Sequence, residues 1–313
     1  MSVSARRGVF LAPFDELVDP NVLADLGARA QERGWDGLFL WDHIVYRPPV
    51  RAVADPWVAL SAIASATSSL RLGPMVTPLS RRRVHKLARE TVTLDHLSRG
   101  RLIFGVGLGS DRNNELGPFG EELDPRERAR LLDHGLNRLA DYWAGEFQPL
   151  PVQKPRIPIW VAARWPHRRP VRRAARWDGL FPIDLPGPEQ LAELRDEISE
   201  ARAGRDDRFD LVAEIAPGAE AAPWEAAGAT WVLTGFGSQP REAEVRDVIE
   251  AGPQGTSAAA PDPPHLGAAN GSARGLCRRR ARSPRGSSPR ACRRGGLRDS
   301  APESVAWRES GRG

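Results

Sequence analysis

Residues 71–107, RLGPMVTPLSRRRVHKLARETVTLDHLSRGRLIFGVG, contain a strand, a helix and a second strand in succession. The first and last parts, Arg71–Val76 and Arg101–Gly107, are short and mostly apolar runs, typical of parallel strands that are buried on both faces. Between them, apolar side chains recur at spacings of three and four, which predicts an amphipathic helix: Val84, Leu87, Ala88, Thr91, Leu94 and Leu97. The stretch therefore predicts a strand–helix–strand unit with parallel strands.

The same alternation continues on both sides of this unit. It gives eight candidate strands: Gly8–Ala12, Gly37–Trp41, Arg71–Val76, Arg101–Gly107, Ile157–Ala162, Gly179–Ile183, Asp210–Ile215 and Thr230–Thr234. Three of the helices between them begin with Asp followed by Pro, a helix-start signal: Asp19-Pro20, Asp55-Pro56 and Asp124-Pro125. Eight such units in about 250 residues predict one (β/α)8 TIM barrel of the α/β class over residues 1–251.

Charge and cysteine content divide the chain at the same place. The 313 residues carry a net charge of +5, but residues 252–313 hold 12 Arg, no Lys and four acids, a net +8. Residues 1–251 therefore carry −3. Both cysteines, Cys277 and Cys292, also lie after residue 251. The barrel segment consequently has no disulfide, no cysteine nucleophile and no cysteine-bound metal.

The segment 252–313 is rich in Arg, Pro, Gly and Ser and poor in large apolar residues, so we expect a disordered tail. Two interpretations stay open. The tail is either an arm that binds nucleic acid or an extension without selected function, produced by a frameshift or read-through. The chain has no apolar run of about 18 residues, which predicts a cytoplasmic protein that does not span a membrane.

In a TIM barrel, chemistry takes place at the carboxyl ends of the strands. Trp41-Asp42-His43 follows the second strand. His43 is a candidate proton donor or base, and Asp42 a candidate for fixing its tautomer. The alternative is that Asp42 caps a loop and that His43 is an ordinary surface histidine.

The next two strand ends have unusual backbones. Pro74 and Pro78 flank Met75 and Val76, which predicts a bulge in the third strand. After the fourth strand, the glycines of Gly105-Val106-Gly107-Leu108-Gly109 allow a ligand to approach the backbone closely. Glu115 lies a few residues further on, as either a catalytic acid, a substrate contact or a solvated side chain.

The fifth strand leads into Ala162-Ala163-Arg164, and Arg168 and Arg169 stand at the start of the following helix. Arginines at a helix N-terminus oppose the helix dipole, and a bound phosphate would reverse that penalty. The alternative is that they point into solvent or pair with acidic residues such as Asp184. The run Arg81–Arg83 has the same two interpretations, with a solvated face favoured. The sequence contains no metal-binding cluster.

The loops together resemble the bacterial luciferase-like monooxygenase family, which includes enzymes dependent on the deazaflavin coenzyme F420. The similar motifs follow the family order over about residues 8–250: Gly34-Trp35-Asp36-Gly37 with Trp41-Asp42-His43; Leu72-Gly73-Pro74-Met75-Val76-Thr77-Pro78; Leu87-Ala88-Arg89-Glu90-Thr91 with Leu97-Ser98-Arg99-Gly100-Arg101; Gly105–Gly109; and Ile157–Ala162 with Arg173–Gly179.

The resemblance implies an oxidoreductase or monooxygenase, a flavoprotein-like enzyme that acts on a small organic substrate with FMN or F420. It implies a non-prolyl cis peptide at Met75–Val76 and a proton-donating role for His43. A homodimer or a flavin reductase is the implied partner. The implied cofactor contacts are Trp41, Met75, Val76, Thr77, Gly107, Leu108, Gly109, Ala162, Ala163 and Arg164.

The chain departs from the family at positions that would separate the two cofactors. Ser110 occupies the position of a catalytic glutamate of some F420 enzymes, and Leu108 that of a phosphate-binding arginine of the luciferases. The segment Ala144–Arg156 is shorter than its family counterpart. Two other functions remain as alternatives: a non-redox isomerase or lyase with a phosphorylated substrate, and nucleic-acid binding through the tail.

Overall fold

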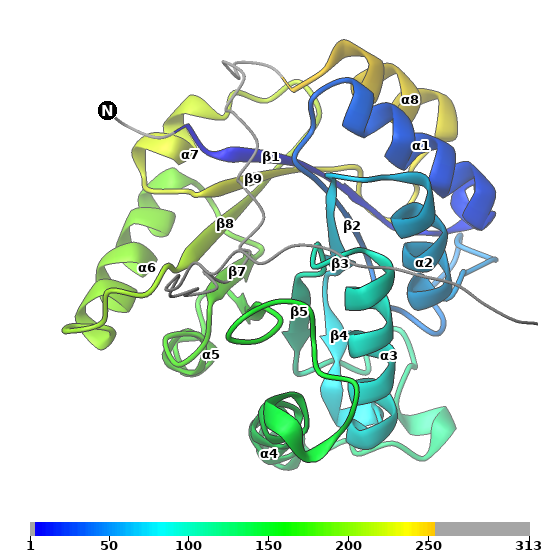
Figure 1. The fold of residues 1–313 in the computed structure, drawn as a ribbon. Coiled ribbons are helices and arrows are strands. Elements are labelled where there is room, and N and C mark those ends of the chain that lie inside the picture. Colours follow the sequence, from blue (N-terminus) through cyan, green and yellow to red (C-terminus); the bar gives the residue numbers. More distant parts are fainter. Residues whose placement is uncertain (1–3, 254–313) are drawn as a thin grey trace, which may run out of the picture. The chain divides into compact units, whose positions relative to one another are not determined.

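The computed structural model describes residues 4–253, and these form a nearly closed barrel of parallel strands surrounded by helices (Figure 1). The strands are β1 Arg6–Leu11, β2 Gly37–Leu40, β3 Arg71–Pro74, β4 Thr77–Pro78, β5 Phe104–Gly107, β6 Ile159–Arg164, β7 Gly179–Ile183, β8 Asp210–Ile215 and β9 Trp231–Gly235. Their order in the sheet is β3-β2-β1-β9-β8-β7-β6-β5-β4. Because β3 and β4 are consecutive pieces of one segment, the two edges of the sheet meet there, and the predicted (β/α)8 barrel is confirmed.

The barrel closes through direct backbone contact between β3 and the residues that precede β5. Leu72 forms a parallel bridge with Leu102, and the amide of Ile103 donates to the Leu72 carbonyl at 2.9 Å. A Cβ on Gly73 would overlap the Ile103 carbonyl oxygen, and one on Gly105 would overlap the Pro74 carbonyl oxygen. Glycine at these two positions therefore lets the two backbones touch.

Two predicted strand boundaries were wrong, and both lie where the barrel closes. The third strand is not continuous over Arg71–Val76, because the cis peptide Met75–Val76 separates β3 from β4. The fourth strand begins at Phe104 rather than Arg101, because Leu102 and Ile103 pair with β3 before the chain joins β4 and β6. The predicted bulge and the predicted cis peptide are both confirmed.

Eight α-helices follow the strands in the described part of the chain: α1 Pro20–Glu32, α2 Pro56–Ala66, α3 Val84–Leu97, α4 Pro125–Asp141, α5 Arg169–Ala174, α6 Pro188–Ala201, α7 Ala222–Ala226 and α8 Glu242–Ala251. The three Asp-Pro starts are confirmed. Asp19, Asp55 and Asp124 each accept a backbone N–H of the first helical turn at 2.8–2.9 Å. These caps satisfy donors that would otherwise lack partners.

Large side chains fill the interior of the barrel. Phe39, Trp160 and Trp231 are completely buried there, with ring centroids 5.4–5.7 Å apart. The side chains that share this cluster are Phe10, Met75, Ile103, Phe181, Val212 and Leu233. A second core lies between the sheet and the helices. Because the interior is a packed core, it has no room for a ligand, and in a TIM barrel ligands bind at the carboxyl ends of the strands.

The predicted tail, residues 252–313, lies outside the described residues except for Gly252 and Pro253. Its predicted disorder and its two interpretations stay predictions. Within residues 4–253, no helix is both long enough and apolar enough to cross a membrane.

We predict that Gly73→Ala lowers the free energy of unfolding by about 3 kcal/mol or more, because the new methyl group would collide with a rigid backbone carbonyl. Gly187→Ala is the matched control. Gly187 has an extended φ of −176°, and an added Cβ would meet only the Gln190 side chain, at 3.4 Å. Urea unfolding of both variants measures the effect, and equal stability of the two would contradict the role given to Gly73.

Candidate functional site

Asp42 is a buried carboxylate directly after β2, and four side chains surround it. Arg81 and Arg82, which follow β4, donate to its oxygens at 3.0 and 2.7 Å. The Thr77 hydroxyl donates at 2.7 Å and the Trp57 indole N–H at 3.2 Å. Asp42 therefore ties the segments after β2 and β4 to α2, and all its bonding capacity is used by the protein.

Glu115, in the segment after β5, joins this network through Arg81. Arg81 donates to Glu115 Oε1 at 3.0 Å, and the backbone amide of Ile44 donates to the same oxygen at 2.9 Å. The other oxygen lies 2.7 Å from His43 Nδ1. The carboxylate that holds His43 is thus Glu115, and the prediction that Asp42 performs this task was wrong. Asp42 acts through Arg81 instead.

The surroundings of Glu115 keep it ionised. Burial alone would raise its pKa, but the hydrogen bond and charge of His43, the Ile44 amide and the Arg81 guanidinium hold the pKa below its ordinary value of 4.5. An ionised carboxylate accepts a hydrogen bond from the Nδ1–H of the imidazole. Nε2 is then the ring nitrogen left to exchange a proton with a ligand.

His43 lies among aromatic rings at the barrel mouth, by which we mean the carboxyl-terminal edge of the strands. Its ring centroid is 5.0 Å from Tyr46, 5.7 Å from Trp41 and 5.8 Å from Phe14. Its side chain is 23% exposed. The imidazole is therefore fixed by a carboxylate and by ring packing, and part of it still faces outward.

Three of the predicted cofactor contacts come together above the interior core. Trp41, Val76 and Ala162 are partly buried and pack on that core, and so does Ile183, which the sequence did not single out. Met75 lies below them and is almost completely buried. These side chains give the mouth an apolar floor between β2 and β7.

Other predicted contacts face elsewhere. The Thr77 side chain is fully buried, and its hydroxyl is committed to Asp42. Ala163 belongs to the core between sheet and helices. A Cβ on Gly107 would lie 2.8 Å from the Val76 side chain. At Gly107, packing against the bulge thus already requires glycine, without any ligand.

The other glycine-segment residues, Leu108 and Gly109, are partly exposed at the end of β5. Leu108 packs against the core between sheet and helices. Gly109 has a φ of +74°, and a Cβ there would lie 2.9 Å from the Pro78 side chain. At position 109, the positive φ and the packing against Pro78 require glycine even without a ligand. Both residues are exposed enough to contact one.

Two of the three predicted arginines near α5, Arg164 and Arg168, are already paired with acids. Arg164, at the end of β6, forms an ion pair with Asp184, which is the alternative left open by the sequence. Its side chain is 39% exposed, and burial together with the charge of nearby Arg112 lowers its pKa. Arg168 pairs with Glu193 and Glu197 of α6, so it turns away from the mouth. Arg164 therefore remains the candidate for binding an anion.

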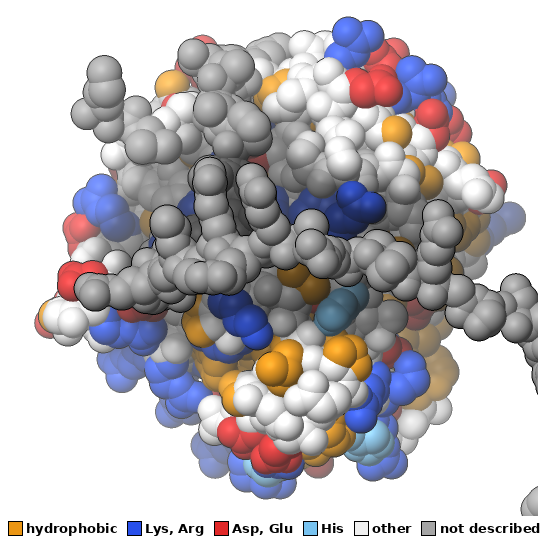
Figure 2. Space-filling view, viewed as in Figure 1, with side chains coloured by type: hydrophobic (Ala, Val, Ile, Leu, Met, Phe, Trp, Pro, Cys, Tyr) orange, Lys and Arg blue, Asp and Glu red, His pale blue; other side chains and the backbone are white. Residues whose placement is uncertain are grey.

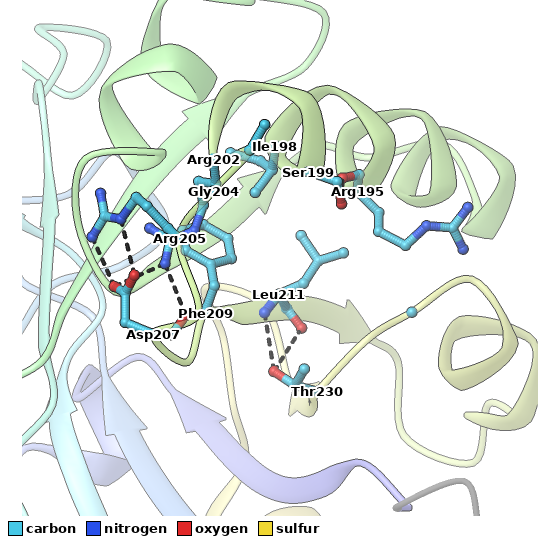
Figure 3. A pocket seen from close by; sticks show the side chains of 12 residues that line it. Arg195, Ile198, Ser199, Arg202, Gly204, Arg205, Asp207, Phe209, Leu211 and Thr230 are labelled. Atoms are coloured by element: carbon cyan, nitrogen blue, oxygen red, sulfur yellow. Dashed lines mark hydrogen bonds and ion pairs between the residues drawn. The ribbon is translucent and has the colours of Figure 1, made fainter.

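A cavity of about 400 Å³ lies at the opposite end of the strands, between α6 and the start of β8 (Figure 3). Arg202 and Arg205 line it, and both pair with Asp207. Arg202 also donates to the carbonyls of Ala175 and Trp177 at 3.0 Å. Since the protein itself occupies these donors, we assign the cavity a structural rather than a ligand-binding role.

Charges elsewhere on the described barrel are mixed. On the face shown in Figure 2, Lys and Arg side chains lie around much of the outline, with Asp and Glu side chains among them. Within residues 4–253, no group of three or more His, Cys, Asp or Glu residues is placed to bind a metal.

Sequence reasoning missed the roles of Arg81 and Arg82. The run Arg81–Arg83 was predicted to favour a solvated face, but the Arg81 side chain is only 1% exposed. A usable signal was present, because the run directly follows a strand end that faces the mouth. Acidic residues after the neighbouring strands, Asp42 and Glu115, supply the countercharge.

Comparison with known proteins identifies the family. The family model for luciferase-like monooxygenases matches residues 7–268. An uncharacterized protein of Mycobacterium tuberculosis (strain H37Rv) is 34% identical over 209 residues, 61% of this chain and 71% of that protein. An F420-dependent glucose-6-phosphate dehydrogenase of Microbacterium testaceum is 30% identical over 225 residues, 64% of this chain and 65% of that protein. The chain belongs to the luciferase-like monooxygenase family and is an oxidoreductase.

Solved structures show the same fold. An F420-dependent secondary alcohol dehydrogenase in complex with an F420–acetone adduct superposes with a TM-score of 0.64 at 15% identity, over 80% of this chain and 98% of that one. The oxygenating constituent of 3,6-diketocamphane monooxygenase of Pseudomonas putida, in complex with FMN, gives 0.58 at 16% identity, over 69% and 68%. The non-redox isomerase or lyase alternative gains no support from these comparisons.

We predict that Glu115→Gln lowers the free energy of unfolding at pH 7 by about 1.5–3 kcal/mol, because charge-assisted hydrogen bonds are lost. A depressed pKa stabilises the fold above the ordinary value of 4.5, and this contribution disappears as pH falls through the lowered pKa. The gap between wild type and variant should therefore close in acid.

The control is Glu90→Gln on α3. Glu90 pairs with Lys86 one helical turn away, and the lysine side chain is 67% exposed, so the loss should stay below about 1 kcal/mol. Denaturant titrations between pH 3 and pH 7 measure both variants. A gap for Glu115→Gln that does not change with pH would contradict the assignment.

Proposed function

We propose that this protein is an FMN- or F420-dependent oxidoreductase that acts on a small organic substrate at the barrel mouth. The observation that carries the proposal is the position of His43. It is held on Nδ1 by Glu115 and lies beside the apolar floor formed by Trp41, Val76 and Ala162. A proton-transfer group next to a flat apolar surface is what a ring-shaped redox cofactor and its substrate require.

The residues present fit such a cofactor. Trp41, Val76 and Ala162 offer apolar contact to a planar ring, and the indole N–H of Trp41 is buried with no partner among residues 4–253. Arg164, which is 39% exposed at the end of β6, would donate charge-assisted hydrogen bonds to a phosphate. When bound, FMN or F420 would accept or deliver the electrons of the reaction, because amino-acid side chains do not carry out this redox chemistry.

His43 would move a proton at Nε2. With Glu115 ionised, the imidazole can take up a proton at Nε2 and return it while the ring keeps its orientation. Arg81 would keep the charge of Glu115 balanced during this exchange. Asp42 serves as a positioning residue, because its side chain holds Arg81 and Arg82. Among the hydrogen bonds of the described residues, none joins the Asp42 side chain to His43.

Both cofactors remain candidates. Among the similar proteins described above, two names include F420 and one includes FMN, and Ser110 and Leu108 do not favour either. We further propose that residues 1–251 form the catalytic unit, that the protein acts in the cytoplasm, and that a homodimer or, with FMN, a flavin reductase completes it.

Titration with FMN and with F420, followed by visible absorption, should reveal binding of one of them. Arg164→Ala should weaken that binding about ten- to a hundredfold, because a charge-assisted hydrogen bond to phosphate is lost. Arg168→Ala is the control, since Arg168 pairs with α6. If the wild type binds neither cofactor, the proposed function is wrong.

His43→Asn should keep cofactor affinity within a few-fold of wild type but reduce kcat about 10²–10⁴-fold, the usual contribution of a proton-transfer group. Steady-state kinetics measure kcat, and cofactor titration measures the affinity. Full turnover by His43→Asn would remove His43 from the mechanism without touching the cofactor assignment.

A further inference from the structure

Glu214 is a half-buried acid near the end of β8 that neither the network around Arg81 nor the role of His43 uses. Alternate residues of a strand face the same side, and Val212, two positions earlier, lies in the interior core of the barrel. Glu214 therefore faces the interior side of the barrel at its mouth. No motif or spacing in the sequence singles it out.

The carboxyl group of Glu214 lies over the neighbouring strand. A Cβ on Gly235, at the end of β9, would overlap Glu214 Oε1 and would lie 3.1 Å from its Cδ. Gly235 pairs in register with Phe10 of β1, and the Phe10 ring is 5.8 Å from the Trp41 ring. The absence of a side chain at Gly235 thus lets Glu214 reach toward the part of the mouth where Trp41 lies.

Within residues 4–253, Glu214 has neither a hydrogen-bond partner nor an ion pair. Its two neighbours in the sheet, β7 (GLFPI) and β9 (WVLTG), contain no ionisable residue. Burial is the cause that raises its pKa. A carboxyl group with no cation beside it favours its neutral form, in which it can both donate and accept a hydrogen bond.

The strands divide the mouth into two sides. Apart from Trp41 after β2, the proposed cofactor contacts lie between the bulge before β4 and the end of β6, whereas Glu214 and Gly235 lie on β8 and β9. In the sheet order, β9 and β1 separate β8 from β2, which carries Trp41 and His43. The side formed by β8, β9 and β1 is therefore the one left for substrate.

We propose that Glu214 is a substrate-binding residue that hydrogen-bonds a neutral oxygen group, a hydroxyl or a carbonyl, of the organic substrate. This inference rests on the proposed function, since it assumes that the cofactor occupies the side of β4 to β6. It narrows the substrate class to alcohols and carbonyl compounds. An ammonium group would instead require the ionised form of Glu214.

The first test uses the protein without ligand. Because burial raises the pKa of Glu214, ionising it destabilises the folded state as pH rises above the ordinary value of 4.5. Glu214→Gln should therefore have a higher Tm than wild type at pH 8 and the same Tm near pH 4. Glu220→Gln, a change at an exposed site after β8, should show no such difference. Equal Tm values for Glu214→Gln and wild type at pH 8 would overturn the unpaired state of this carboxyl.

The second test measures binding of cyclohexanol, cyclohexanone and cyclohexylamine to the cofactor-loaded protein, followed by the change in cofactor absorption. These probes share one ring and differ in the polar group. Cyclohexanol and cyclohexanone should bind wild type, Glu214→Gln and Glu220→Gln alike, and Glu214→Leu about five- to tenfold more weakly, the value of one neutral hydrogen bond.

Each other result has a definite meaning. Equal affinity of wild type and Glu214→Leu, or no binding of either oxygen probe to wild type, would overturn the inference. So would preferred binding of cyclohexylamine that Glu214→Gln abolishes, because that pattern identifies an ammonium site. Failure of the wild type to bind FMN or F420 at the outset would instead count against the proposed function, and the ligand-free test separates the two failures.

Discussion

The candidate site depends on the two ion pairs of the Arg81 guanidinium. Its side chain is 1% exposed and bridges two carboxylates, Asp42 after β2 and Glu115 after β5. A buried charge is tolerated only when it is paired and hydrogen-bonded, and here each partner comes from a different strand end. Removing Arg81 would take the shared guanidinium from both carboxylates at once, so the three segments hold one another in place.

The interior of the barrel beneath this network has no room for a ligand. Aromatic side chains such as Trp160 and Trp231 fill the interior completely, and Gly73 lets β3 close against the segment before β5. A filled barrel makes the mouth rigid from below. The side chains that stand on this core, among them Trp41 and Val76, therefore keep fixed positions relative to His43.

Two acids at the mouth have pKa values shifted in opposite directions. Glu115 touches a guanidinium and an imidazole, which hold its pKa low, whereas Glu214 touches neither and burial raises its pKa. The first is suited to stabilising a positive charge on His43. The second is suited to hydrogen-bonding a neutral group. Environments that drive the pKa values of two acids apart are a common way to assign them different tasks.

Local patterns in the sequence predicted the order of strands and helices, the helix caps and the family. Continuous apolar runs, 3.6-residue periodicity and Asp-Pro pairs are local signals. They predict features that form through local interactions, such as the Asp55 cap. The bulge at Met75–Val76 was also readable, because prolines flank it. His43 was correctly singled out as lying at a strand end.

Which side chains meet could not be predicted from these local patterns. His43 is 72 residues from Glu115 and one residue from Asp42, yet it bonds to Glu115, because the barrel brings the ends of β2 and β5 to the same edge. The same applies to Arg81, which a linear reading assigns to solvent, and to Glu214, whose isolation depends on its neighbours β7 and β9. Partners and burial depend on contacts between distant segments, and these follow from barrel closure rather than from any local pattern.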